Sequence, residues 1–227
     1  MVATDGHRLA LAERKVQVSD SKGELSALIP RKAPTLLPRL AEGGNDSMME
    51  VSKDESHLSF ALGPRMLASR LLTGQFPNYE SVLPKENGRV VRLNSEEFGG
   101  VLRRVSLLAD DRVHGIRFVL DKGNLEVSAS SPEYGEAKEC IEAQYDQETV
   151  EIGLIAQYLL DFLRAATGAT SIRMQVKDAD SAAEFRPSEP EGEHYRYVLI
   201  PLRFQKELAM LEVASHHTGT VVSLGGE

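Results

Sequence analysis

The chain has 227 residues, of which 41% are hydrophobic and 26% are charged, so its composition is that of an ordinary globular protein. This length suits one large domain or two smaller ones, and no apolar stretch reaches the length that a transmembrane helix requires. The formal net charge of −8 argues against nucleic-acid binding through a uniformly basic surface, although it leaves room for a basic stripe on an acidic body.

The first predicted element is a β-hairpin. The alternating runs VAT and RLALAERKV meet at Asp5-Gly6, and Asp-Gly is a favoured hairpin turn. A strand in SALIP then precedes a first helix over residues 32–41, which Pro38 should keep short or kinked. We expect three strands after this helix, in MMEVS, HLSFAL and RMLASRLL.

The second predicted helix follows a strand in RVVRLN. Asn94 can act as its N-cap, and Glu97, three positions later, fits a capping box. Apolar residues then recur at helical spacing, although Gly99 and Gly100 each weaken a helix by about 1 kcal/mol relative to alanine. Three strands are expected next, in GIRFVL, LEVSAS and GEAKECIEAQY, with a DKGN turn between the first two.

The third predicted helix follows a strand in TVEIG. Ile155, Leu159, Phe162 and Leu163 form an apolar stripe at helical spacing, and Gly168 suits the C-terminal stop. The strands expected after it lie in SIRMQV, AAEF and YRYVLIPL.

The order of these elements repeats. Each helix has one strand before it and three after it, so the chain carries three copies of a β-α-β-β-β unit with a period of about 60 residues. One such unit cannot close its own core, so we expect two units per domain, with helices on one face and sheets outside. The result is an α+β fold with an incomplete domain over residues 1–86, a complete domain over 87–204 and an extra tail over 205–227. The polar, turn-rich PKENGR marks the boundary.

Four separated motifs carry a family resemblance. VATDGHRLA at 2–10, IPRK at 29–32, FPNYESVLP at 76–84 and YVLIPLR at 197–203 resemble, in sequence and order, the bacterial sliding clamps, the β subunits of DNA polymerase III. The resemblance implies the DNA-clamp (processivity-factor) fold, in which two subunits of three domains each close into a homodimeric ring around double-stranded DNA. It also implies a non-catalytic accessory subunit, with no catalytic residues, no cofactor and no metal.

The resemblance further implies that this chain covers the last three units of a clamp and the end of the unit before them. We therefore expect an N-terminally truncated clamp that binds clamp peptides weakly and does not close a ring by itself. In this family the pore is lined by helices, which should be locally basic while the outer sheets are acidic. The residues expected to face DNA are Arg31, Lys32, Arg103 and Arg104.

The partners implied by the resemblance are the catalytic and clamp-loader subunits of DNA polymerase III, which insert a short peptide into a groove between two domains. An apolar pocket with a few polar groups suits such an anchor. Ile155 stands where many clamps have an asparagine, which removes a hydrogen-bonding group from the groove. The residues expected to line it are Thr4, Gly6, His7, Arg8, Leu9, Pro77, Val82, Tyr158, Val198, Ile200, Pro201, Leu202 and Arg203.

Two other functions compete with this interpretation. A truncated clamp could serve only as a peptide-binding module, and ring closure would separate it from a DNA-encircling clamp. A metal-dependent hydrolase could use Asp5, His7, Asp110, Asp111 and His114, but no established ligand spacing such as HExxH is present. Cys140 is the only cysteine, which rules out an internal disulfide, and with no recognisable leader sequence the expected compartment is the cytoplasm.

Overall fold

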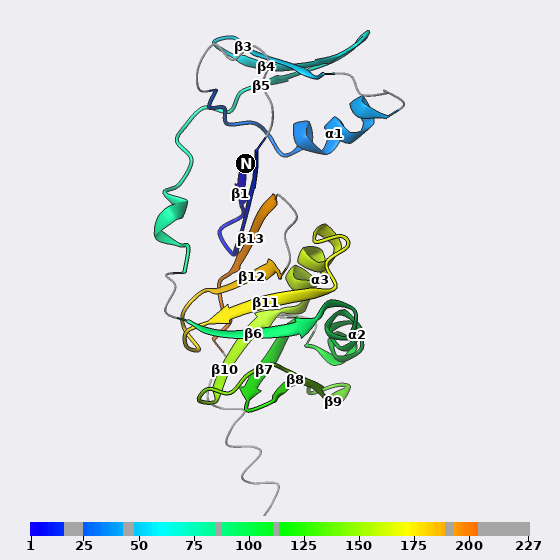
Figure 1. Ribbon diagram of the computed structural model, residues 1–227, viewed down its shortest axis with the longest axis vertical. Helices are drawn as coiled ribbons and strands as arrows, with labels where there is room; N and C mark the ends of the chain where they lie inside the picture. Colours follow the sequence, from blue (N-terminus) through cyan, green and yellow to red (C-terminus); the bar gives the residue numbers. More distant parts are fainter. Residues whose placement is uncertain (16–24, 43–47, 85–87, 111–113, 189–192, 204–227) are drawn as a thin grey trace, which may run out of the picture. The chain divides into compact units, whose positions relative to one another are not determined.

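The computed structural model describes residues 1–15, 25–42, 48–84, 88–110, 114–188 and 193–203 (Figure 1). By internal contacts the chain divides into two compact units, one of Met1–Lys15 with Tyr79–Glu227 and one of Val16–Asn78. The hairpin that was expected in the first domain thus groups with the larger unit, while the boundary at residues 86 and 87 stays a prediction. Among the described residues, no helix combines the length and the apolar character needed to cross a membrane.

The smaller unit consists of one helix and a three-stranded antiparallel sheet. Helix α1 spans Lys32–Ala41, as predicted, and the sheet contains β3 (Glu50–Lys53), β4 (His57–Leu62) and β5 (Arg65–Arg70). Buried residues alternate with exposed or half-buried ones along strand β4, which is the pattern of a strand with one face in the core. Its buried side chains pack with the helix in a small core of Leu40, Leu58, Phe60 and Leu62.

The strand predicted in SALIP is wrong. Residues 25–30 form no strand. They make one backbone–backbone hydrogen bond with the sheet region, in which the amide of Leu72 donates to the carbonyl of Leu28 at 2.8 Å, and the side chain of Lys53 donates to the carbonyl of Ser26 at 2.6 Å. One bond is not a ladder, and Pro30 at the end of the segment has no amide hydrogen to extend it. In its described residues, the first repeat is therefore α-β-β-β.

The larger unit contains the two complete repeats, and its helices and sheets form the predicted α+β architecture. Asn94 caps α2 as expected, since its side-chain oxygen accepts hydrogen bonds from the amides of Glu96 and Glu97, both at 3.0 Å. Short 3-10 turns span Tyr79–Ser81 and Ser106–Leu108. The elements of the two repeats are β6 (Arg89–Asn94), α2 (Ser95–Val105), β7 (Gly115–Asp121), β8 (Asn124–Ser131), β9 (Gly135–Glu142), β10 (Val150–Ile155), α3 (Ala156–Ala165), β11 (Ser171–Val176), β12 (Ala183–Pro187) and β13 (Glu193–Leu199).

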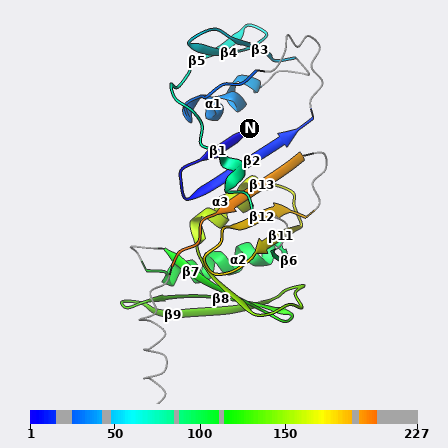
Figure 2. The same cartoon turned by 90° about the vertical axis from the view of Figure 1, so that its left-hand side faces the viewer.

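The two repeats exchange their first strands. Strand β6 precedes α2 but pairs with β11 of the second repeat, and β10 precedes α3 but pairs with β7 of the first. One sheet therefore has the order β10-β7-β8-β9, and the other contains β13-β12-β11-β6 (Figures 1 and 2). Because each sheet needs a strand from the other repeat, neither repeat can complete its hydrogen bonding alone.

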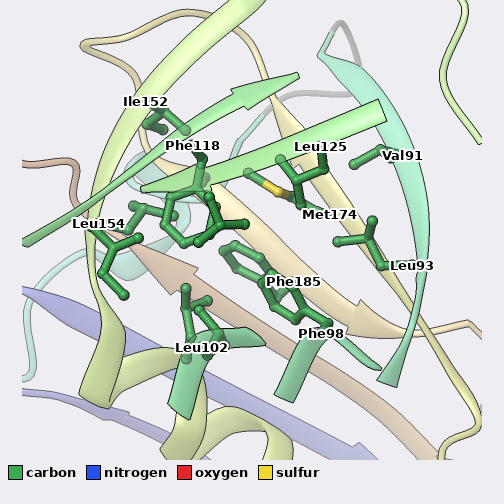
Figure 3. Packing of buried hydrophobic residues seen from close by; sticks show 14 of the residues in the cluster. Val91, Leu93, Phe98, Leu102, Phe118, Leu125, Ile152, Leu154, Met174 and Phe185 are labelled. Carbon is green, nitrogen blue, oxygen red and sulfur yellow. The ribbon is translucent and has the colours of Figure 1, made fainter. Parts of the chain in front are cut away.

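Both helices of the larger unit pack against the sheets through a shared core. Phe98 and Leu102 on α2 point toward Phe118 of one sheet and Phe185 of the other (Figure 3), and all four side chains are fully buried. On α3, the ring of Phe162 lies 5.8 Å from that of Phe185 and 5.5 Å from that of Tyr197. Buried aromatic pairs of this kind add packing energy to the area they bury.

The N-terminal hairpin extends the second sheet. It consists of β1 (Val2–Thr4) and β2 (Arg8–Arg14), and β2 pairs antiparallel with β13 from Arg8 opposite Leu199 to Arg14 opposite Glu193. The complete order of this sheet is β1-β2-β13-β12-β11-β6. Segments that lie about 190 residues apart in the chain are thus neighbouring strands.

Glu184 on β12 is a buried carboxylate, with 1% of its surface exposed. Its carboxylate accepts hydrogen bonds from Arg196 at 3.1 and 2.7 Å and from Arg186. Burial tends to raise the pKa of Glu184, but the bonds from Arg196 and Arg186 outweigh it, so the pKa lies below its usual value.

We predict an acid-sensitive contribution of Glu184 to stability. Because the pKa of Glu184 is lower in the folded state, its contribution is complete above the unfolded-state pKa of about 4.3 and is lost as the pH falls further. Replacing Glu184 with Gln should lower the free energy of unfolding at neutral pH by about 3 kcal/mol, since two arginines lose a buried partner. Urea unfolding between about pH 3 and pH 7 measures both effects.

The exposed Glu136 provides the matched control, since Glu136→Gln removes a carboxylate of the same kind from the edge strand β9. The Glu184→Gln protein should lose less stability on acidification than the control does. Equal pH dependence in the two variants would contradict the assignment.

Candidate functional site

The turn of the N-terminal hairpin is held by Asp5. One oxygen of its carboxylate accepts the amides of His7 and Arg8 at 3.1 and 3.0 Å, and the other accepts Arg8 Nε at 2.9 Å. Gly6 has a φ of 90°, a backbone conformation that favours glycine, and Thr4 Oγ1 donates to the carbonyl of Arg8 at 2.8 Å. The turn therefore presents His7 to solvent and directs Arg8 toward the helix side of the sheet.

Arg8 joins the hairpin to α3 and β13. Its Nη1 donates to Asp161 Oδ2 at 2.8 Å and to the hydroxyl of Tyr197 at 3.1 Å, and its guanidinium carbon lies 4.2 Å from the centre of the Tyr158 ring. The last contact is a cation–π geometry. Burial tends to raise the pKa of Asp161, but the bond from Arg8 outweighs it and the pKa lies below its usual value. The predicted site residues Arg8 and Tyr158 are thus in direct contact.

The apolar residues of the site lie on the other face of the same sheet. Leu9 and Val198 are opposite each other in register and are buried with Leu11, while Tyr79 and Leu83 pack over them. They form a floor and are not themselves accessible. Val82, by contrast, is 40% exposed.

A pocket of about 430 Å³ opens beside this floor. Its lining combines the segment after the 3-10 turn at Tyr79 with the ends of β11 and β12, and of the predicted groove residues it contains Val82. The lining residues are Ser81, Val82, Leu83, Pro84, Gly88, Gln175, Lys177, Ser181 and Ala182.

The segment after β13 continues along the hairpin. The amide of Ile200 donates to the carbonyl of His7 at 2.9 Å, and the amide of Leu202 donates to the carbonyl of Gly153 at 2.8 Å. Ile200 is 44% exposed, Pro201 and Leu202 are half-buried, and Arg203 pairs with Asp180 at 2.9 Å. Pro77 is exposed but belongs to the smaller unit, so its part in the groove stays a prediction.

The basic residues expected to face DNA are all exposed, but they differ in their partners. Arg31 and Lys32 lie at the start of α1, and Arg103 and Arg104 lie in the last turn of α2. Arg104 forms a two-point ion pair with Glu139 of β9, at 2.8 and 2.6 Å. Its charge is therefore partly compensated, while Arg103 has no carboxylate partner among the described residues.

The residues considered for metal-assisted hydrolysis do not gather. Asp5 is engaged by Arg8, and the amide of His114 donates to the backbone carbonyl of Asp110, while Asp111 lies outside the described residues. In the ranges that the structure describes, no three His, Cys, Asp or Glu side chains come together in a way that could hold a metal ion.

Sequence reasoning missed Asp161 and Tyr197, which hold Arg8, and the residues of β11 that line the pocket. Asp161 follows Tyr158 by three positions, a spacing that places both on one side of a helix, so a signal for it was present. Gln175 and Lys177 carried none, because only the pairing of β11 with β12 brings them beside Ala182.

Comparison with known proteins relates the chain to one protein family. Residues 1–78 match the family model of the DNA polymerase III beta subunit, central domain, and residues 80–203 match that of its C-terminal domain. The beta sliding clamp of Proteus mirabilis is 31% identical over 202 residues, which cover 89% of this chain and 54% of the relative. The chain thus spans about half the length of the curated relatives it matches.

Solved structures agree with this result. The DNA polymerase III subunit beta of Pseudomonas aeruginosa superimposes with a TM-score of 0.82 at 31% identity, over 89% of this chain and 55% of that one. A sliding clamp from Bartonella birtlesii, solved bound to griselimycin, gives a TM-score of 0.82 at 32% identity, over 89% of this chain and 54% of that one. The chain therefore belongs to the DNA polymerase III beta subunit family, the bacterial beta sliding clamps.

Proposed function

We propose that the chain acts as a DNA sliding clamp, a non-catalytic processivity factor that tethers the replicative polymerase to duplex DNA by docking a short peptide. The observation that carries the proposal is the pairing of β2 with β13, which gathers the residues from Thr4 to Leu9 and from Val198 to Arg203 around one sheet end. The chain spans about half the length of its relatives, so ring closure is a separate question from peptide docking.

Peptide docking is supported by the chemistry of the sheet end. A pocket with an apolar rim at Val82, Leu83 and Ala182 also has polar groups at Ser81 and Gln175. Most small-ligand and peptide pockets combine an apolar surface with a few polar groups that orient the ligand. The exposed side chains of His7 and Ile200 extend the available surface along the hairpin. We assign this region to the clamp-binding peptides of polymerase and clamp-loader subunits.

DNA tethering is supported by the arrangement of the helices. Helices α2 and α3 contact each other beside the sheets (Figure 1). Two exposed arginines, Arg103 and Arg104, lie in the last turn of α2. A ring that slides needs weak, sequence-independent attraction to phosphates, which a few arginines on an otherwise acidic body can supply. We assign Arg103, Arg104, Arg31 and Lys32 to this role.

Ring closure is assigned to the edge of the four-stranded sheet. Strand β9 is the last strand of that sheet in the described part of the chain, and Leu107, in the 3-10 turn after α2, is 77% exposed. An open strand edge beside an exposed apolar side chain suits pairing with another subunit. The alternative function is a peptide-binding module that does not encircle DNA. It differs from the clamp in that this strand edge does not pair with another subunit.

Retention on circular DNA tests the function. The 227-residue chain is incubated with a nicked plasmid and with the same plasmid linearised, and each mixture is passed over a gel-filtration column. Elution of the chain with circular DNA and its loss from linear DNA would establish topological tethering. Binding of the clamp-binding peptide without retention on either DNA would leave the peptide-binding module as the function.

The peptide site is tested by Val82→Ser. Because Val82 is exposed, the substitution should not unfold the protein, but it removes an apolar contact from the pocket. We expect the affinity for the clamp-binding peptide of a DNA polymerase III catalytic subunit to fall about fivefold to tenfold, measured by fluorescence anisotropy. Val51→Ser changes a similarly exposed valine on β3 and should have no effect. Equal losses in the two variants would contradict the site.

The two arginines of α2 should contribute differently to DNA binding. Arg104 already pairs with Glu139, so Arg103→Gln should weaken binding to duplex DNA at low salt more than Arg104→Gln does. Each loss should be modest, about twofold to threefold, because single phosphate contacts are weak and screened. Electrophoretic mobility shifts at about 0.05 M salt would measure it. A larger effect of Arg104→Gln would show that the pair opens when DNA binds.

A further inference from the structure

Four arginines form a row across the second sheet. Arg92 on β6 is opposite Arg173 on β11, which is opposite Arg186 on β12. The ladder of β12 with β13 ends at Phe185 opposite Tyr197, so Arg186 and Arg196 occupy the next position of that register, and both bond to Glu184. Residues directly opposite in adjacent strands point to the same face. Neighbouring strands lie about 4.8 Å apart, so the row spans about 14 Å. We call Arg92, Arg173, Arg186 and Arg196 the arginine row.

The arginine row should lower the stability of the sheet. Like charges directly opposite each other in a sheet repel. Two carboxylates adjoin the row on the same face of the sheet. Glu184 lies on β12, and Glu13 lies on β2, opposite His194 of β13. Glu184 holds Arg186 and Arg196, and Arg173 bonds to the neutral side chain of Gln175 at 3.2 Å. Among the described residues, the four arginines thus outnumber the carboxylates around them, on a chain whose net charge is −8.

The arginine row continues the surface of the pocket. Along β11 the residues Arg173 and Gln175 share one face, and Lys177, just past the strand end, continues their alternation. Gln175 and Lys177 line the pocket. The row lies on the opposite face of the sheet from the core residues Met174 and Phe185, and therefore from α2 and α3. This position separates the arginine row from the face assigned to duplex DNA.

We propose that the arginine row binds acidic residues that flank the docked peptide of a partner protein. The proposal rests on the peptide site described above, because it takes the pocket as the place where the partner's apolar anchor lies. A peptide that leaves the pocket along β11 meets Arg173, with Arg92 and Arg186 on either side. Guanidinium groups pair with carboxylates in a two-point geometry, which gives specificity for acidic side chains over neutral ones.

The experiment compares three labelled peptides by fluorescence anisotropy. The first is the clamp-binding peptide of a DNA polymerase III catalytic subunit with four glutamates added at one end, tested with the glutamates at either end. The second has four glutamines in the same places, and the third has the glutamates but no apolar anchor. The row variant is Arg92→Gln with Arg173→Gln, because Arg186 and Arg196 are needed by the buried Glu184. The matched control is Arg70→Gln with Arg117→Gln, two strand arginines outside the row.

We expect the glutamates, at one end of the peptide, to strengthen binding about fivefold to tenfold at about 0.05 M salt and much less at about 0.5 M salt. The row variant should lose this gain and keep its affinity for the glutamine peptide, whereas the control should keep both. The anchorless peptide should bind weakly to the wild type and not to the row variant.

Three results would overturn the proposal: no gain from glutamate, a gain that survives in the row variant, or an equal loss in the control. A row variant that loses duplex or single-stranded DNA binding and keeps the glutamate gain would assign the row to nucleic acid instead. Failure of the peptide site itself is recognised separately. In that case the glutamine peptide does not bind the wild type, and the anchorless peptide alone then decides whether the row binds carboxylates.

Discussion

The pairing of β2 with β13 is the interaction on which the candidate site depends. It is a backbone ladder over seven residue positions, continued past the strand end by the bond from the amide of Ile200 to the carbonyl of His7. It turns two edges into interior strands of one six-stranded sheet. Register then decides which side chains meet, because a shift of one residue would send Arg8 to the outer face and Leu9 to the inner one.

The pairing is effective because both strands are anchored elsewhere. The exchange of β6 and β10 between the two repeats ties the sheets together, and the shared core around Phe98, Phe118 and Phe185 holds β12 and β11 in place. Tyr197 on β13 contacts Phe162 on one side and Arg8 on the other. The site is thus built on strands and a helix of a packed body, which gives a docking surface more definition than loops would.

The net charge of the protein says less about its binding surfaces than the individual arginine–carboxylate pairs do. The net charge is negative, yet arginines occupy the candidate binding surfaces. They are Arg8 over Tyr158, the two arginines in the last turn of α2, and the arginine row. The carboxylates of Asp161, Glu184 and Glu139 each hold one or two of them in a defined orientation. A guanidinium that is already oriented loses less side-chain entropy when a ligand binds.

Much of the architecture was predictable from local patterns. Periodicity, the Asn94 cap and turn residues predicted all three helices and nearly every strand, because those signals act within a few residues. The order of elements predicted the repeats, and the motifs at 2–10 and 197–203 predicted the family. The strand in SALIP failed because its apolar alternation had no partner strand with which to form a ladder.

Only the tertiary structure decided which distant residues meet. Strand exchange, the depth of Leu9 and Val198 below Tyr79 and Leu83, and the burial of Glu184 all follow from pairings between segments far apart in the chain. Such pairings carry no local signal, since the free energy that selects them comes from burial and register in the assembled sheet. The same reason explains the arginine row: the sequence contains its four residues, and the register alone aligns them.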